Sequence, residues 1–125
     1  MRLLLVLLGG ALGSGARYGV GVWAATRFGA AFPWGTLTVN VAGSFLIGLL
    51  ATLANELGRI GPEGRIFLLV GVLGGFTTFS SFSLETVRLM EHNEPARALA
   101  NILASLTLAI GATLLGVAAG RVLGR

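Results

Sequence analysis

The sequence predicts an all-α integral membrane protein, built as a bundle of four transmembrane helices. Hydrophobic residues make up 54% of its 125 residues and charged residues only 11%, whereas soluble domains carry about 25% charged residues. Four apolar segments are long enough to cross a bilayer, and short polar connectors separate them. Glycine contributes 20 residues, which in apolar helices indicates that backbones approach one another closely.

The first span is predicted over about residues 3–28. Its basic start and apolar run imitate a secretory signal peptide, but apolar residues continue past the potential cleavage site. Arg17 lies inside this span, where an arginine needs water or a partner. Two interpretations stay open: Arg17 has a function at membrane depth, or it extends to the interface beside Tyr18.

The second span is predicted over about residues 36–56 and carries a polar stripe. Thr36, Asn40 and Ser44 recur every four residues, so their side chains share one face of a helix. Such a stripe either forms hydrogen bonds between helices or contributes to a functional site. Asn40 is the member that we assign least readily to packing, because an amide in the middle of a span needs a partner.

The third span, about residues 66–90, contains ten unusually polar residues at 74–83, near its middle. Gly74 and Gly75 weaken the helix at this point, so we predict a broken third helix whose freed carbonyl groups need partners. Where two copies meet, such carbonyls would make an oxygen-lined cation site. The hydroxyl side chains of this stretch belong to Thr77, Thr78, Ser80, Ser81 and Ser83.

The fourth span, about residues 96–120, has a polar face formed by Asn101 and Ser105. Hydroxyl, amide and guanidinium groups therefore occur on one face of each span, and these hydrogen-bond donors suit an anion. The rings of Phe76, Phe79 and Phe82 either pack in the bundle or turn their positive edges to that anion, with Phe79 and Phe82 the favoured pair.

Several other functions find no support in the residues. The sequence offers no carboxylate pair, no histidine cluster and no nucleophile beside a base, so we expect no enzyme activity. The net charge is +4, but the arginines are scattered singly, which argues against nucleic acid as a partner and favours anchoring in lipid headgroups.

The oligomeric state follows from charge and packing. Arginines near the termini and the second connector number five, against three near the other connectors. This weak bias indicates that the chain inserts in both orientations. Four tightly packed helices leave no lumen, so a pathway is expected between the two copies of a homodimer. The arginines near the termini and the second connector are Arg2, Arg59, Arg65, Arg121 and Arg125. Those near the other two connectors are Arg27, Arg88 and Arg97.

Three stretches resemble the Fluc (CrcB-type) fluoride channels: residues 9–18 (GGALGSGARY), 35–45 (GTLTVNVAGSF) and 74–85 (GGFTTFSSFSLE). The resemblance covers essentially the whole chain. It implies an antiparallel, dual-topology homodimer with two fluoride pores at the subunit interface and a structural sodium ion on the twofold axis. It also implies passive export of fluoride from the cytoplasm across the cell (inner) membrane, in contact with lipid.

The resemblance also implies roles for individual residues. Phe79 and Phe82 match the rings that face fluoride, Asn40, Thr36 and Ser105 match polar pore residues, and Gly74 and Thr77 match the residues whose backbone carbonyls hold sodium. Arg17 matches the first-helix arginine and Glu85 an acid beyond the helix break, while Thr78 and Ser81 join the pore set from the polar stretch itself.

The fourth helix departs from the family pattern. Many relatives have a tyrosine one turn before the serine, where this chain has Asn101, and a hydroxyl one turn after it, where this chain has Ala109. The polar track along this helix is therefore altered at one end and shortened at the other.

Two other functions compete with the fluoride channel. A small four-helix, dual-topology multidrug exporter needs an acid in the membrane, but the first span holds none and Glu85 is a poor substitute. A non-conducting assembly subunit explains the glycines yet gives no role to Asn40 or the hydroxyl stripes.

Overall fold

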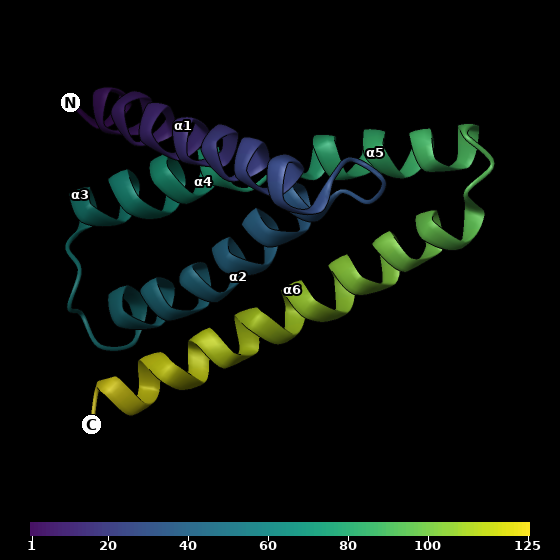
Figure 1. Cartoon of the computed structure of the whole chain (residues 1–125). Helices are drawn as coiled ribbons and strands as arrows, with labels where there is room; N and C mark the ends of the chain where they lie inside the picture. Colours follow the sequence, from purple (N-terminus) through teal and green to yellow (C-terminus); the bar gives the residue numbers. More distant parts are fainter.

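The computed structural model describes residues 1–125 and is helical throughout, apart from short connections. The elements are α1 (Arg2–Phe28), α2 (Trp34–Asn55), α3 (Pro62–Arg65), the π-helix η1 (Ile66–Leu73), α4 (Gly74–Phe76), α5 (Phe79–Glu91) and α6 (Pro95–Leu123). The chain runs back and forth along the bundle, so both termini lie at the same end (Figure 1).

Proline and positive-φ residues mark the ends of the long helices. Gly29 has φ +79 and ends α1, because glycine adopts this backbone conformation without the steric cost of a Cβ atom. Asn93 has φ +58 in the connection before α6, and Pro95 then occupies the first turn of α6. Both connections are short and reverse the chain direction, which places successive helices side by side.

The third crossing segment, Pro62–Glu91, comprises α3, η1, α4 and α5. Two extended residues separate α4 from α5. We predicted the weak point at Gly74 and Gly75, but these glycines lie in α4. Extended backbone follows at Thr77 (φ −90, ψ 157) and Thr78 (φ −153, ψ 115). We call these two residues the extended pair. The position predicted for the weak point was therefore wrong by two or three residues, and the reason lies on α2, as described below.

Glycine allows the third crossing segment to lie directly against α1. A methyl group on Gly9 would come within 2.5 Å of the Phe67 carbonyl oxygen and 2.9 Å of the Gly71 Cα atom. Such contacts exclude any larger residue at this crossing, which agrees with the close packing expected from the glycine content. α2 packs mainly against α6, and α1 packs mainly against η1, so the bundle contains two helix pairs.

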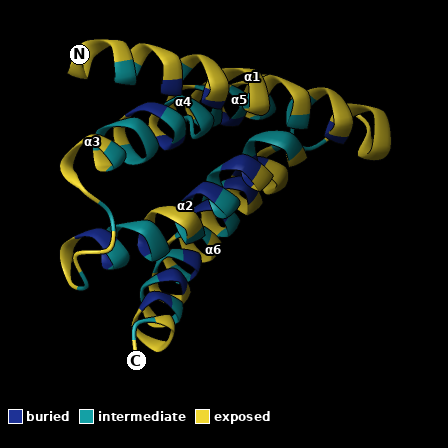
Figure 2. Cartoon of the chain, turned by 90° about the vertical axis from the view of Figure 1, so that its left-hand side faces the viewer, coloured by how far each residue is buried: buried dark blue, intermediate teal, exposed yellow.

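Few residues are buried, and most of them are glycine or alanine. Among the larger buried side chains are Leu37, Val39 and Leu73, while the outward faces of the helices expose leucine, isoleucine and valine. Figure 2 shows buried residues where helices face one another and exposed residues around the outside. Four crossing segments are long and apolar enough to span a bilayer. The chain is a multi-pass membrane protein, whose apolar exterior suits lipid and neighbouring subunits.

Candidate functional site

Seven of the ten predicted site residues surround one hollow, which we call the central groove. It has a volume of about 320 Å³ and lies between α2, the third crossing segment and α6. Its lining includes Asn40, Gly74, Thr77, Thr78, Phe79, Phe82 and Ser105. These residues come from three separate crossing segments, so only the folded bundle brings them together.

Two aromatic rings form one wall of the central groove. The ring centroids of Phe79 and Phe82 lie 5.4 Å apart, with the ring planes at 56°. Both rings line the groove, and the edges of aromatic rings carry the positive end of their quadrupole. Phe79 is 76% exposed in a single copy of the chain, whereas Phe82 is half-buried.

Asn40 holds the extended pair in place. Its Nδ2 donates to the Thr78 carbonyl oxygen at 2.9 Å, and its Oδ1 accepts from the Thr78 backbone N–H at 2.7 Å. The side-chain amide thus satisfies both backbone groups of a residue that has left the helix, as a membrane interior requires. This pairing explains why the extended residues lie opposite Asn40 and not at the flexible Gly74 and Gly75.

Thr78 also begins α5. Its Oγ1 accepts from the Ser81 backbone N–H at 3.1 Å, which makes it the N-cap of this helix. The same Oγ1 donates to Ser81 Oγ at 3.1 Å. The hydroxyl proton of Thr78 is therefore directed at Ser81, whose own proton remains free for another acceptor.

The extended pair leaves two backbone carbonyls without their usual helical donors. In a continuous helix, the N–H groups of Thr78 and Ser81 would reach the carbonyls of Gly74 and Thr77. Here these two N–H groups donate instead to Asn40 Oδ1 and to Thr78 Oγ1. The carbonyl oxygens of Gly74 and Thr77 are the type of ligand that hard cations prefer.

Arg17 extends from α1 toward the third crossing segment. Its Nε donates to the Gly75 carbonyl oxygen at 3.0 Å, a further carbonyl near the end of α4. Arg17 also lines a second hollow of about 490 Å³, the α1 groove, together with Thr36, Thr78 and Ser81. Thr78 lines both grooves, so the extended pair stands between them.

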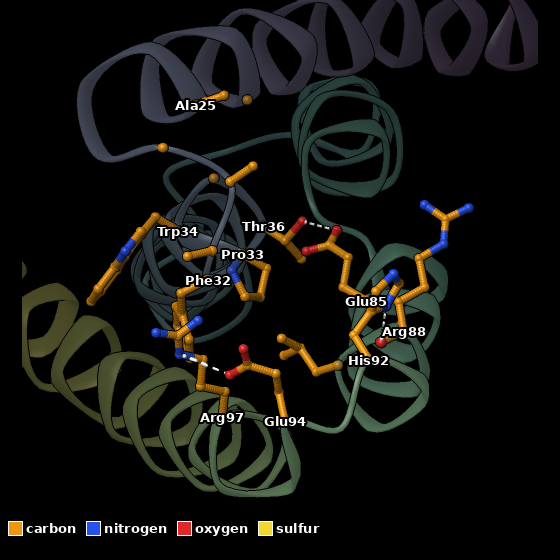
Figure 3. A pocket seen from close by; sticks show the side chains of 16 residues that line it. Ala25, Phe32, Pro33, Trp34, Thr36, Glu85, Arg88, His92, Glu94 and Arg97 are labelled. Atoms are coloured by element: carbon orange, nitrogen blue, oxygen red, sulfur yellow. Dashed lines mark hydrogen bonds and ion pairs between the residues drawn. The ribbon is translucent and has the colours of Figure 1, made fainter.

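A third hollow, the mouth pocket, opens at the end of the bundle that holds the α1–α2 and α5–α6 connections. It has a volume of about 650 Å³. Thr36 Oγ1 donates to Glu85 Oε1 at 2.6 Å in its wall, and Glu94 pairs with Arg97 at 3.2 Å (Figure 3). Thr36 belongs to both the mouth pocket and the α1 groove, which places this hydroxyl–carboxylate pair where the two hollows adjoin.

Thr86 lies behind the central groove, and the sequence did not bring it to attention. It lies one turn after Phe82 on α5 and is buried against α6, where Asn101 Nδ2 donates to its Oγ1 at 2.9 Å. The hydroxyl of a threonine in a helix usually donates to a carbonyl of the same helix. The sequence therefore gives no sign that this hydroxyl also accepts a hydrogen bond from another helix. Its four-residue spacing from Phe82 is the signal that could have identified it.

Comparisons with known proteins identify the family of this chain. The family described as "CrcB-like protein, Camphor Resistance (CrcB)" matches residues 4–117. A Rhizobium meliloti protein named "Fluoride-specific ion channel FluC" is 54% identical over 117 residues, which is 94% of each chain. Proteins of the same name from Agrobacterium fabrum (52% over 121 residues, 97% of each chain) and Thermus thermophilus (54% over 119 residues, 95% of this chain and 93% of the relative) are similar to it.

The match therefore extends over nearly the whole chain and includes all of the segments that line the central groove. Relatives that share half of their residues over nearly their whole length have the same fold. From this coverage and identity, the chain belongs to the CrcB family.

Proposed function

We propose that this chain forms a fluoride-selective ion channel that lets fluoride leave the cytoplasm passively and so lowers its toxicity. The observation that carries the proposal is the convergence of Phe79, Phe82, Asn40 and Ser105 on the central groove. Relatives that share about half of their residues with this chain are named as fluoride-specific channels. The proposed activity is permeation and involves no covalent chemistry.

Fluoride is small and strongly hydrated, so its pathway must replace water with donors at close range. Ser81 and Ser105 provide hydroxyl groups beside the grooves, and the ring edges of Phe79 and Phe82 provide weaker positive charge without a counterion. A narrow pathway of this kind disfavours the larger chloride ion.

The proposed assembly is an antiparallel homodimer, with two pores at the interface between its subunits. Phe79 supports this proposal, because its ring is exposed in one copy although the pathway would need it enclosed. The central groove is likewise only partly enclosed in a single copy, and a second copy would close it. Insertion in both orientations, expected from the weak arginine bias, is what an antiparallel pair requires.

A structural sodium ion on the twofold axis completes the proposal. The carbonyl oxygens of Gly74 and Thr77 lack the N–H donors that a continuous helix would give them, which supports their role as ligands. These oxygens from both copies would coordinate the ion, which would join the two extended pairs. Asn40 would keep the extended pair in the conformation that presents them.

Fluoride efflux from proteoliposomes tests the function. Vesicles loaded with potassium fluoride should release fluoride to a fluoride electrode when the protein is present and the membrane potential is released with an ionophore. Vesicles loaded with chloride should release almost none. No fluoride efflux, or equal efflux of chloride, would refute the proposal. Proton-coupled efflux of a cationic dye would favour the small multidrug exporter instead.

Two further measurements test the assembly. Tags at the C-terminus should be accessible from both sides of the membrane, and a single sidedness would refute dual topology. Purification with and without sodium, followed by the same efflux assay, should show reduced flux and a smaller dimer fraction when sodium is absent.

A further inference from the structure

Three buried polar side chains connect α5 and α6 through a directed chain of hydrogen bonds. Ser105 Oγ donates to Asn101 Oδ1 at 3.4 Å, and Asn101 Nδ2 donates to Thr86 Oγ1 at 2.9 Å. Thr86 Oγ1 in turn donates to the Phe82 carbonyl oxygen at 2.8 Å. Asn101, Thr86 and Ser105 are only 1%, 6% and 9% exposed, so this chain is inside the subunit and shielded from lipid.

The number of protons fixes the direction of the chain. A threonine hydroxyl has one proton, and that of Thr86 is committed to the Phe82 carbonyl, so Thr86 accepts from the Asn101 amide. With its NH₂ group at Thr86, Asn101 presents its oxygen to Ser105. Thr86 and Asn101 are thereby each held in one donor–acceptor role.

The two ends of this series of hydrogen bonds lie at the central groove, but its middle does not. Ser105 and Phe82 line the groove, whereas Asn101 and Thr86 do not belong to its wall. The bond between Asn101 and Thr86 is the only side-chain hydrogen bond that joins α5 to α6. This bond therefore sets the relative position of two groove residues that belong to different helices.

We propose that Asn101 is a positioning residue for the fluoride pathway. Through Thr86 it holds the Phe82 turn of α5 against α6, and through its Oδ1 it orients the hydroxyl of Ser105. It does this without contacting the ion. The inference rests on the proposed function, and it gives the asparagine at this departure from the family pattern a role inside the subunit.

The two hydrogen bonds of the Asn101 side chain differ in length and therefore in strength. The 2.9 Å bond to Thr86 has ordinary length, whereas the 3.4 Å bond from Ser105 is long and therefore weak. An anion in the groove can attract the Ser105 proton at little cost, because only this weak bond is lost. The Asn101–Thr86 bond is unaffected, so the positions of Phe82 and Ser105 are kept while the hydroxyl turns.

The test measures the position of Phe82 and the flux separately, on the full-length protein. The chain is produced with 4-fluorophenylalanine, and the Phe82 signal in the ¹⁹F spectrum is identified by its loss in Phe82→Leu. The variants are Asn101→Leu and Thr86→Val, with Thr86→Ser as the conservative variant that keeps the hydroxyl. Thr52→Val is the matched control: Thr52 is 4% exposed and donates to the Gly48 carbonyl at 2.8 Å, but has no partner on another helix.

We expect Asn101→Leu and Thr86→Val to move or broaden the Phe82 signal and to lower fluoride flux by about fivefold, the effect of the one interhelical hydrogen bond that both variants lose. Thr86→Ser should restore both, and Thr52→Val should change neither. The double variant Asn101→Leu/Thr86→Val should be no worse than Asn101→Leu, because both changes break the same link. If Asn101→Leu does not fold, Thr86→Val and Thr86→Ser decide the question.

An unchanged Phe82 signal in Asn101→Leu and Thr86→Val would overturn the inference, as would a moved signal with wild-type flux. An equal effect of Thr52→Val would also overturn it, since that result would indicate general destabilisation. These failures differ from failure of the proposed function, in which the wild-type chain itself conducts no fluoride. In that case both the proposed function and the role of Asn101 in permeation are refuted.

Discussion

Asn40 forms two hydrogen bonds with the backbone of Thr78, one through each end of its side-chain amide, at 2.9 and 2.7 Å. The side chain thus takes the place of a neighbouring strand for a single residue. In lipid, an extended residue with no such partner would leave two polar groups unsatisfied. Asn40 therefore determines where the third crossing segment leaves the helical path.

Replacing Asn40 tests this dependence. Asn40→Leu should leave the N–H and carbonyl groups of Thr78 unpaired, at a cost of about 1–3 kcal/mol for each group. We expect a lower unfolding temperature in detergent and loss of fluoride flux from proteoliposomes. The control is Thr38→Val on the same helix, because Thr38 is bonded only to the Trp34 carbonyl of its own helix. Wild-type flux in Asn40→Leu would contradict the prediction.

The ring of Phe82 gives a second prediction. Phe82→Leu keeps an apolar side chain of similar size but removes the positive ring edge beside the central groove. Fluoride flux should fall by about threefold to tenfold if that edge stabilises the ion as strongly as it does another aromatic ring. Phe28→Leu is the control, since Phe28 packs on Trp23 with centroids 5.7 Å apart and lies outside the groove. Equal rates for the two variants would assign Phe82 to packing.

Gly43 gives a prediction about the extended pair. A methyl group at Gly43 would overlap the methyl group of Thr77, so Gly43→Ala should displace the backbone of Thr77 and its carbonyl oxygen. We expect a smaller dimer fraction in the presence of sodium, measured by light scattering in detergent. The control is Gly111→Ala, which meets no atom within 4 Å and should leave the dimer intact while stabilising its helix by up to about 1 kcal/mol.

The ion pair between Glu56 and Arg121 predicts a pH dependence at the end of the bundle that holds the termini. Hydrogen bonds of 3.0 and 2.9 Å from Arg121 lower the pKa of Glu56 below its ordinary value. A lowered pKa contributes stability above the pKa of the unfolded chain, and this contribution is lost as the pH falls through the folded value.

Glu56→Gln should therefore lower the unfolding temperature slightly at neutral pH, because the pair is exposed to solvent. The difference from wild type should disappear as the pH is lowered past the pKa of the paired carboxylate. Glu63→Gln is the control, since Glu63 has no ion-pair partner. A difference that grows on acidification would contradict the assignment.

Part of the site could be predicted because helical spacing is regular. Thr36, Asn40 and Ser44 repeat every four residues and do share a face of α2. Thr86 escaped prediction because its bond to Asn101 joins two helices, and the spacing within one helix carries no information about the other. The extended pair was misplaced for a similar reason: glycine flexibility is local, while the amide that satisfies Thr78 lies on α2.

The sequence alone determined that this protein crosses a membrane with four helices, because length and apolar composition decide which segments leave water. It also determined that polar groups lie inside the bundle, since lipid offers them no partners. The tertiary structure decided which of these groups meet. It paired Asn40 with Thr78, directed Arg17 to Gly75 and placed Asn101 between Thr86 and Ser105. Such pairings depend on how helices cross, and helix crossing is set by packing over the whole bundle and by no single segment.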